Sequence, residues 1–194
     1  MSSGPHGYEL LRVDDRAAWR EWLQRNHASA QGVWVVSWRT QTGKPRLDYD
    51  ALVEEALCFG WVDSREQPVD DERSMQLVTP RKHGSAWARS NKERIARLES
   101  AGAIADAGAR VVEAARADGS WSRYDSVEAL EIPPDLAAAL EASAEAARNF
   151  DAFTDAAKRT ILRWLIDAKR PETRAKRIEE TARLAATNER AGPS

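Results

Sequence analysis

The chain has 194 residues and a formal net charge of −2, with 42% hydrophobic and 31% charged residues. This balance is typical of a globular protein and excludes both a disordered chain and a histone-like polycation. One cysteine excludes an internal disulfide and a zinc site built from cysteines, and the length predicts one or two domains.

The N-terminal half alternates between strand and helix patterns. One helix is expected after Asp14 or Asp15, and another over about 48–59, ending at Gly60, a residue suited to left-handed backbone. Short apolar runs predict strands over residues 8–13, 33–38, 61–66 and 74–79. We therefore predict an α/β unit over residues 1–80, with a sheet of about four strands and two helices.

The pattern becomes helical beyond residue 80. A helix begins at Ser85, or at Ser90 if Ser90-x-x-Glu93 is a capping box. Thr154 caps a later helix, and Pro171 occupies the first position of the last one. Further helices are expected over residues 105–117 and 133–140, with residues 120–132 irregular. Residues 81–194 are thus predicted to be all-helical, and the fold class is α+β.

The first residues lack the basic start and apolar run of a secretory signal. The sequence also lacks 18 consecutive apolar residues, which a membrane-spanning helix requires. We expect a cytoplasmic protein without a transmembrane segment, and the sequence does not predict its oligomeric state.

The common catalytic and cofactor signatures are missing from the sequence. It contains no dinucleotide or phosphate-binding glycine motif, no nucleophile elbow and no zinc-protease motif, so we expect no cofactor. The histidines lie too far apart in the sequence to predict a metal site; they are His6, His27 and His83. Cys58 is expected to be an inert, semi-buried thiol, and Glu54 and Glu55 to lie on a solvated helix face.

A first candidate site begins at the predicted strand after Gly60. Trp61, Asp63 and Arg65 alternate onto one face of that strand, which suits a polar pocket with an aromatic wall. The alternative is that Trp61 packs at the edge of the core while Asp63 and Arg65 form an ordinary ion pair.

A second candidate site lies around the start of the following helix. Arg81, Lys82 and His83 precede this helix start, where free backbone N–H groups also attract anions. Trp87 and Asn91 share a face of the predicted helix, and Asn91 is polar where an apolar residue is expected. An anion or phosphate site and a solvated basic loop both remain open.

Several motifs resemble the bacterial YdeI/OmpD-associated family over about residues 8–185. They are Gly32-Val33-Trp34, Lys44-Pro45 with Tyr49, Phe59-Gly60-Trp61-Val62-Asp63, Asp70-Asp71-Glu72-Arg73, Thr79-Pro80-Arg81 with Ser85, Trp87 and Asn91, and residues 168–174 with Arg177-Ile178. The family often has glycine where this chain has Ser64, which would narrow any approach of a ligand to the backbone there. It also often has Arg-Phe near Leu77.

The resemblance implies a soluble α+β unit followed by a helical part, and a link to porin association, bacteriocin protection and antimicrobial-peptide resistance. It supplies no catalytic residues. It adds Tyr49 and Lys44 to the candidate ligand-binding residues, which are Trp61, Asp63, Arg65, Arg81, Trp87, Asn91, Tyr49 and Lys44.

The first functional hypothesis is a non-enzymatic module in stress or envelope protection that binds a small anionic ligand or a protein partner. An enzyme acting on a small anion, with Asp63 and Arg81 in its site, is the alternative. Weak nucleic-acid binding is the third hypothesis, because residues 156–194 carry a net charge of +5, although acidic residues interleave. The arginines it would use are Arg159, Arg163, Arg170, Arg174 and Arg177.

Overall fold

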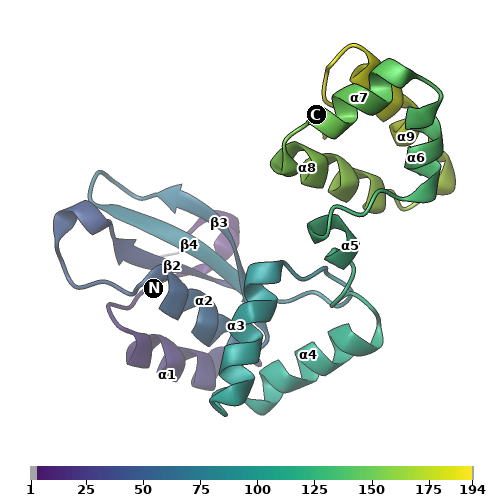
Figure 1. Cartoon of the computed structure of the whole chain (residues 1–194). Helices are drawn as coiled ribbons and strands as arrows, with labels where there is room; N and C mark the ends of the chain where they lie inside the picture. Colours follow the sequence, from purple (N-terminus) through teal and green to yellow (C-terminus); the bar gives the residue numbers. More distant parts are fainter. Residues whose placement is uncertain (1–3, 194) are drawn as a thin grey trace. The chain divides into compact units, whose positions relative to one another are not determined.

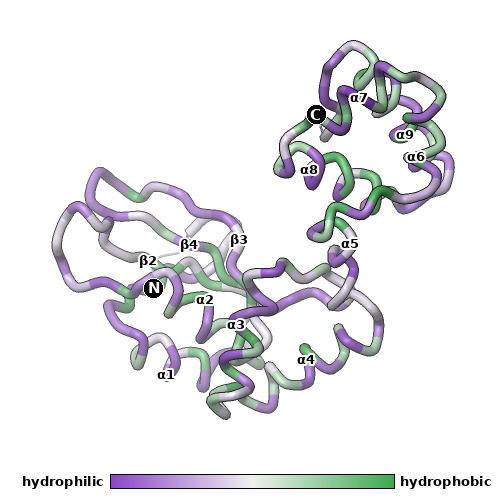
Figure 2. Tube along the Cα trace, viewed as in Figure 1, coloured by the Kyte–Doolittle hydropathy of each residue, from purple (hydrophilic) through white to green (hydrophobic). Residues whose placement is uncertain are grey.

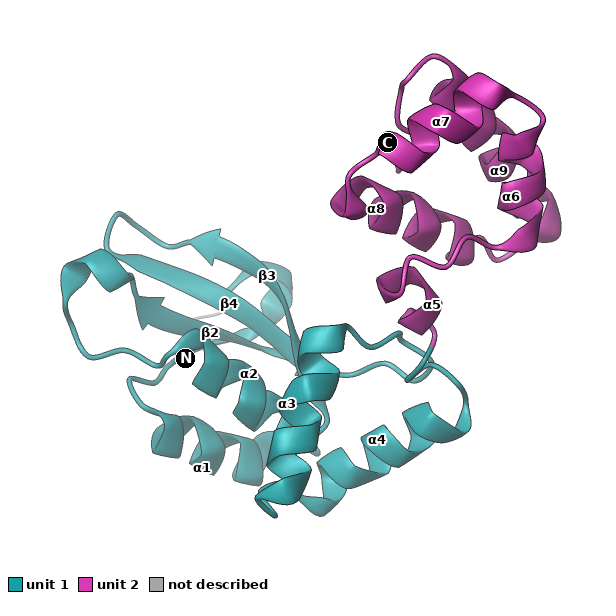
Figure 3. Cartoon of the chain, in the orientation of Figure 1, with its two compact units in different colours: residues 1–122 teal, residues 123–194 magenta. Residues whose placement is uncertain are grey.

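The computed structural model describes residues 4–193 and divides the chain into two compact units (Figure 3). Unit 1 is Met1–Ser122 and unit 2 is Arg123–Ser194. Unit 1 holds the sheet and unit 2 holds helices, which confirms the predicted α+β class (Figure 1).

Unit 1 is a mixed four-stranded sheet with helices, as far as its residues are described. The strand order is β1-β2-β4-β3; β1 and β2 are parallel, whereas β4 is antiparallel to both neighbours. Its elements are η1 (Pro5–Gly7), β1 (Glu9–Arg12), α1 (Arg16–Asn26), β2 (Val33–Trp38), η2 (Thr40–Thr42), α2 (Tyr49–Cys58), β3 (Trp61–Pro68), β4 (Arg73–Pro80), α3 (Arg89–Ser100) and α4 (Asp106–Ala117). The predicted strands and first two helices are confirmed.

The main core of unit 1 lies between one face of the sheet and the helices. Hydrophobic residues, green in Figure 2, follow β2, β4 and α2. Val33, Val35 and Val78 project from the sheet into the same cluster as Trp19 of α1 and Leu52 of α2, and all five are buried. The opposite face of the sheet holds a smaller cluster of Trp34, Val36 and Met75. The sheet therefore buries side chains on both faces.

Helices α3 and α4 belong to unit 1, whereas the predicted change of region lies at residue 80. Ile95 and Leu98 of α3 and Val112 and Ala115 of α4 are buried in the main core cluster. The two helices complete the core of the sheet, so the division of the chain falls after residue 122. Both predicted starts of this helix, Ser85 and the Ser90 capping box, are wrong: α3 begins after Ala88, which makes no side-chain cap, so Trp87 precedes the helix that carries Asn91.

The backbone of α4 lies directly against the end of α2. A Cβ atom on Gly108 would lie 2.3 Å from the Cys58 carbonyl oxygen, and the Ala105 N–H donates to that same oxygen at 3.1 Å. Gly60, which ends α2 with φ +75°, is similarly close, since its Cβ would lie 2.7 Å from Val111. Only glycine fits at these two positions.

Glu55 is buried, which makes the expectation of a solvated face wrong for this residue. It is 2% exposed and accepts hydrogen bonds of 2.6 Å from both Arg16 Nε and Arg20 Nη1. Arg20 also donates to the Ala103 carbonyl oxygen at 3.0 Å. These charge-assisted bonds join α1, α2 and the segment that leads into α4.

Unit 2 is helical throughout its described elements. They are α5 (Asp125–Glu128), α6 (Pro134–Glu141), α7 (Ala144–Ala152), α8 (Asp155–Ile166) and α9 (Pro171–Ala186). Their apolar faces share one core that includes Leu136, Phe150, Ile161 and Ile178. Thr154 caps α8 and Pro171 opens α9, as predicted, whereas α7 was not predicted. None of the helices formed by residues 4–193 has the length and apolarity needed to cross a membrane.

Gly108→Ala tests the close approach of α4 to α2. In an ordinary helix this change gains about 1 kcal/mol. Here the new methyl group must displace the Cys58 carbonyl, so we expect the free energy of unfolding to fall by about 1–3 kcal/mol. Urea denaturation measures this difference. An unchanged or increased stability would show that the backbones do not meet as described.

Candidate functional site

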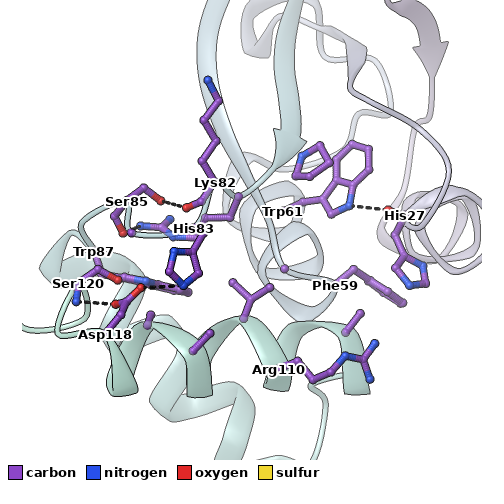
Figure 4. Close-up of a pocket in the computed structure, with 18 of the residues that line it drawn as sticks. His27, Phe59, Trp61, Lys82, His83, Ser85, Trp87, Arg110, Asp118 and Ser120 are labelled. Carbon is purple, nitrogen blue, oxygen red and sulfur yellow. Dashed lines mark hydrogen bonds and ion pairs between the residues drawn. The ribbon is translucent and has the colours of Figure 1, made fainter.

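The candidate site is a cavity of about 360 Å³ in unit 1. It lies where β3 begins and β4 ends, beside α4 and the loop that follows β4. Figure 4 shows Trp61 and His27 on one side, His83 and Asp118 on the other, and α4 with Arg110 below. Unit 1 alone supplies every residue that lines it.

Aromatic and aliphatic side chains form much of the cavity wall. Trp61 is 1% exposed, and its Nε1 donates to the His27 carbonyl oxygen at 3.2 Å (Figure 4). Trp87 is 2% exposed, and Phe59 and Val111 complete this apolar part. The wall therefore suits a ligand with a hydrophobic or aromatic body.

Arg81 is the half-buried cation of the cavity. Its guanidinium carbon lies 3.8 Å from the centroid of the Trp87 ring. Its Nη2 donates to two backbone carbonyl oxygens, those of Ser85 at 3.4 Å and Ala86 at 2.5 Å. In the described part of the chain, Arg81 forms no ion pair, and its buried Nε has no hydrogen-bond partner.

The environment of Arg81 disfavours its charge. Burial lowers the pKa of Arg81 from 12.5 to about 10. The side chain therefore remains a cation at neutral pH, held by a cation–π contact and neutral carbonyls. A cation in this position favours an anionic ligand.

The loop after β4 is held to the end of α4 on the other side of the cavity. His83 Nε2 lies 3.2 Å from a carboxylate oxygen of Asp118, and the Ser120 N–H donates to Asp118 at 2.8 Å. The hydrogen bonds from Ser120 hold the pKa of Asp118 below its usual value. The Lys82 side chain points away from these groups (Figure 4). Arg81 is therefore the cation whose burial distinguishes this cavity.

Three of the predicted site residues, Trp61, Arg81 and Trp87, line this cavity. Asp63 and Arg65 do not. The register of β3 is regular from Trp61 to Asp63 and becomes irregular between Asp63 and Glu66, so the assumed alternation is interrupted at Arg65. Arg65 is exposed. Trp61 both packs in the main core and lines the cavity, which combines the two interpretations of this residue.

Tyr49, Asp63 and Asn91 lie in a separate polar network. The Tyr49 hydroxyl donates to Asp63 at 2.7 Å, while Arg94 donates to Asp50 at 2.5 Å and to Asn91 at 3.3 Å. These bonds join the start of α2 to β3 and α3. The network explains why Asn91 is polar: it accepts from a half-buried arginine.

Lys44 lies apart from both groups of residues. Its Nζ is 3.9 Å from the centroid of the Trp38 ring and 2.8 Å from a carboxylate oxygen of Glu72. The acidic stretch before Arg73 forms the turn between β3 and β4, where Asp70 accepts hydrogen bonds from the Arg73 side chain at 2.8 and 2.6 Å. Lys44 therefore belongs to a surface ion pair.

Sequence reasoning missed the residues that α4 contributes to the cavity. Val111, Ala115 and Asp118 come from or follow this helix, about 50 residues after β3 in the sequence. The available signal was Gly108, a glycine inside a helical pattern, which indicates close packing. Nothing in the sequence around His27 and Phe59 indicated that these residues line a cavity.

Most of the arginines invoked for nucleic-acid binding have acidic or backbone partners. Arg159 and Arg163 pair with Glu128, Arg174 pairs with Asp135 at 2.7 Å, and Arg177 donates to the Trp164 carbonyl oxygen. These partners reduce the free positive charge of α8 and α9. Among the described residues, no group of His, Cys, Asp or Glu could hold a metal ion.

The fold and cavity define an α+β unit with a cationic, aromatic-walled cavity, followed by a helical unit. The chain belongs to the family described as "Domain of unknown function (DUF8412)", whose model matches residues 11–111. Residues 129–188 match the family model described as "Bacteriocin-protection, YdeI or OmpD-Associated". The comparisons found no match among curated proteins and none among solved structures.

The predicted resemblance to the YdeI/OmpD-associated family is confirmed by the match over residues 129–188. The motifs quoted from residues 32–91 lie instead within the DUF8412 match. The cavity lies in unit 1, which the first family model covers over residues 11–111, whereas the residues that match the second family model lie in unit 2.

Tyr49→Phe tests the polar network around Asp63. Partial burial and the bond to Asp63 raise the pKa of Tyr49 from 10.0 to about 12. At about pH 11 such a tyrosine is roughly one-tenth ionised, whereas an ordinary one is roughly nine-tenths ionised. Because the folded state favours the neutral phenol, its contribution to stability is present below pH 10.0 and is lost as the pH rises towards about 12.

We therefore expect the tyrosinate absorbance at about pH 11 to be nearly the same in Tyr49→Phe and in the unmodified protein. Circular dichroism confirms that both remain folded at the pH used. A clear fall in absorbance in the variant would show that Tyr49 ionises normally and that the bond to Asp63 is absent.

Proposed function

We propose that unit 1 binds a small anionic molecule that has a hydrophobic or aromatic body. The observation that carries this proposal is the half-buried guanidinium of Arg81, which has no carboxylate partner in the described chain. A charge removed from water is costly unless it is paired. A ligand carboxylate or phosphate supplies that missing charge.

The size and walls of the cavity support a ligand of this kind. A volume of about 360 Å³ falls in the range of small-molecule sites, roughly 300–1,000 Å³. The indole rings of Trp61 and Trp87 and the side chain of Val111 offer apolar contact beside the cation. An anion attached to an apolar group matches both features.

We propose a binding role in preference to a catalytic one. Asp63 and Arg81 do not line the same cavity, which separates the pair required by the enzyme hypothesis. The carboxylate that does line the cavity, Asp118, has a pKa below its usual value. Such a group is poorly matched to proton transfer near neutral pH.

The proposed biological setting is protection against bacteriocins or related antimicrobial peptides. Its support is the family description of residues 129–188 alone. In this proposal unit 1 is the ligand-binding part of a protective protein.

Arg81→Gln is expected to weaken binding of benzoate and phenyl phosphate more than tenfold. A charge-assisted hydrogen bond contributes about 2 kcal/mol, which corresponds to more than a tenfold change in affinity. Isothermal titration and thermal shift measure this change, and neutral benzyl alcohol should bind much more weakly than either anion. Arg65→Gln, which removes an exposed arginine outside the cavity, should bind like the unmodified protein.

Ala114→Leu is the second variant, because Arg81 also holds the Ser85 and Ala86 carbonyls. The larger side chain occupies cavity space beside α4 and leaves Arg81 in place, so it should weaken the binding of both anions. Binding of neither anion, or equal binding by all variants, would contradict the proposal and direct the search to a protein partner.

A further inference from the structure

A second cavity lies at the other end of α2. Its volume is about 310 Å³, and it shares no lining residue with the cavity around Arg81. The end of β2, the segment over residues 39–47 and the start of α2 surround it, together with the paired part of β3 and β4. The first cavity adjoins the C-terminal end of α2, whereas this one adjoins Tyr49 and Leu52 near its start.

The sheet face that lines this cavity changes from apolar to polar along its length. Val33 pairs with Val78 in the main core, whereas further along the same two strands Val35 pairs with Gln76 and Ser37 with Ser74. Ser37, Ser74 and Gln76 are half-buried and line the cavity. A sheet face covered only by packed helices would be apolar here, whereas these polar groups can form hydrogen bonds to water or to a polar ligand.

Arg39 supplies an unpaired cation in this cavity. Its Nε atom is buried and has no hydrogen-bond partner, and its guanidinium has no carboxylate partner in the described chain. The neighbouring cations differ, since Lys44 pairs with Glu72 at 2.8 Å and Arg46 lies 3.7 Å from Asp48. Arg46 also lines the cavity, and its 3.7 Å contact with Asp48 is too long for a hydrogen bond, so its N–H groups can also donate to a ligand.

The remaining lining groups suit hydroxyl groups. Glu66, Gln76 and Gln41 offer carboxylate or amide oxygens that accept hydrogen bonds, and Ser37 and Ser74 both donate and accept. Leu47 and the Tyr49 ring provide a small apolar side. This combination fits a carbohydrate, which presents hydroxyl groups at its edges and C–H groups on its faces.

We propose that this cavity binds a small polyhydroxylated anion, a sugar phosphate or a sugar acid, whose charged group pairs with Arg39 and Arg46. Guanidinium groups recognise both phosphate and carboxylate through paired N–H bonds. The site is independent of the aromatic-walled cavity, because the two share no lining residue, and its wall is mainly polar where the other is mainly apolar. A protein that bound both ligands would hold two different anions at opposite ends of α2.

The test is a titration of the full chain with glucose 6-phosphate, gluconate and glucose, followed by backbone amide NMR. We expect saturable shifts with at least one anion, concentrated at residues 37–41 and 74–76, and much weaker shifts with neutral glucose. The two anions distinguish a phosphate from a carboxylate as the charged group.

Arg39→Gln should lower the affinity for the anion that binds about tenfold, because it removes the unpaired guanidinium and leaves the ion pairs of its neighbours intact. Gln76→Leu is a second variant that keeps the size of the side chain and removes its amide. Arg65→Gln is the matched control, since Arg65 is an exposed arginine on β3 outside both cavities.

Four results would overturn the proposal. They are the absence of a saturable response to both anions, an equal response to glucose, shifts centred on the Arg81 cavity, and binding that Arg39→Gln leaves unchanged. The proposed function of the first cavity survives all of these results, because its probes and its variant are different.

Discussion

The candidate site depends on the contact between the backbone of α4 and the end of α2. The Cys58 carbonyl oxygen accepts the Ala105 N–H, and Gly108 passes so close to it that no other side chain fits. Gly60 turns the chain from α2 into β3 at the same place with a positive φ. These contacts fix α4 beside the first residue of β3, so the space between them is set by backbone geometry.

The Arg81 loop completes that space. The Arg81 N–H donates to the Gly60 carbonyl oxygen at 2.9 Å, while the guanidinium lies over Trp87 and bonds to the backbone of the loop. The protein thus uses one arginine to hold the loop and to carry an unpaired charge beside aromatic rings. A partly buried charge without a partner lowers the stability of the free protein. An anion that pairs with it would offset this cost, which favours binding.

The sequence predicted the features that depend on local pattern and missed those that depend on distant contacts. The four strands and the Thr154 cap were predictable, because alternation and capping involve residues only a few positions apart. Burial of Glu55 was not, because its partners come from α1. The candidate site was predicted in part: Trp61, Arg81 and Trp87 line one cavity, whereas Asp63 lies two residues further along β3 and accepts a hydrogen bond from Tyr49 of α2.

The most direct measurement is a crystal structure of the protein with 4-bromobenzoate, located by the anomalous signal of bromine. We expect one strong bromine peak against the apolar wall formed by Trp61, Trp87 and Val111, with the carboxylate facing Arg81. A cavity that stays empty while the compound binds elsewhere, or a carboxylate turned away from Arg81, would contradict the claim that this arginine makes unit 1 an anion-binding unit.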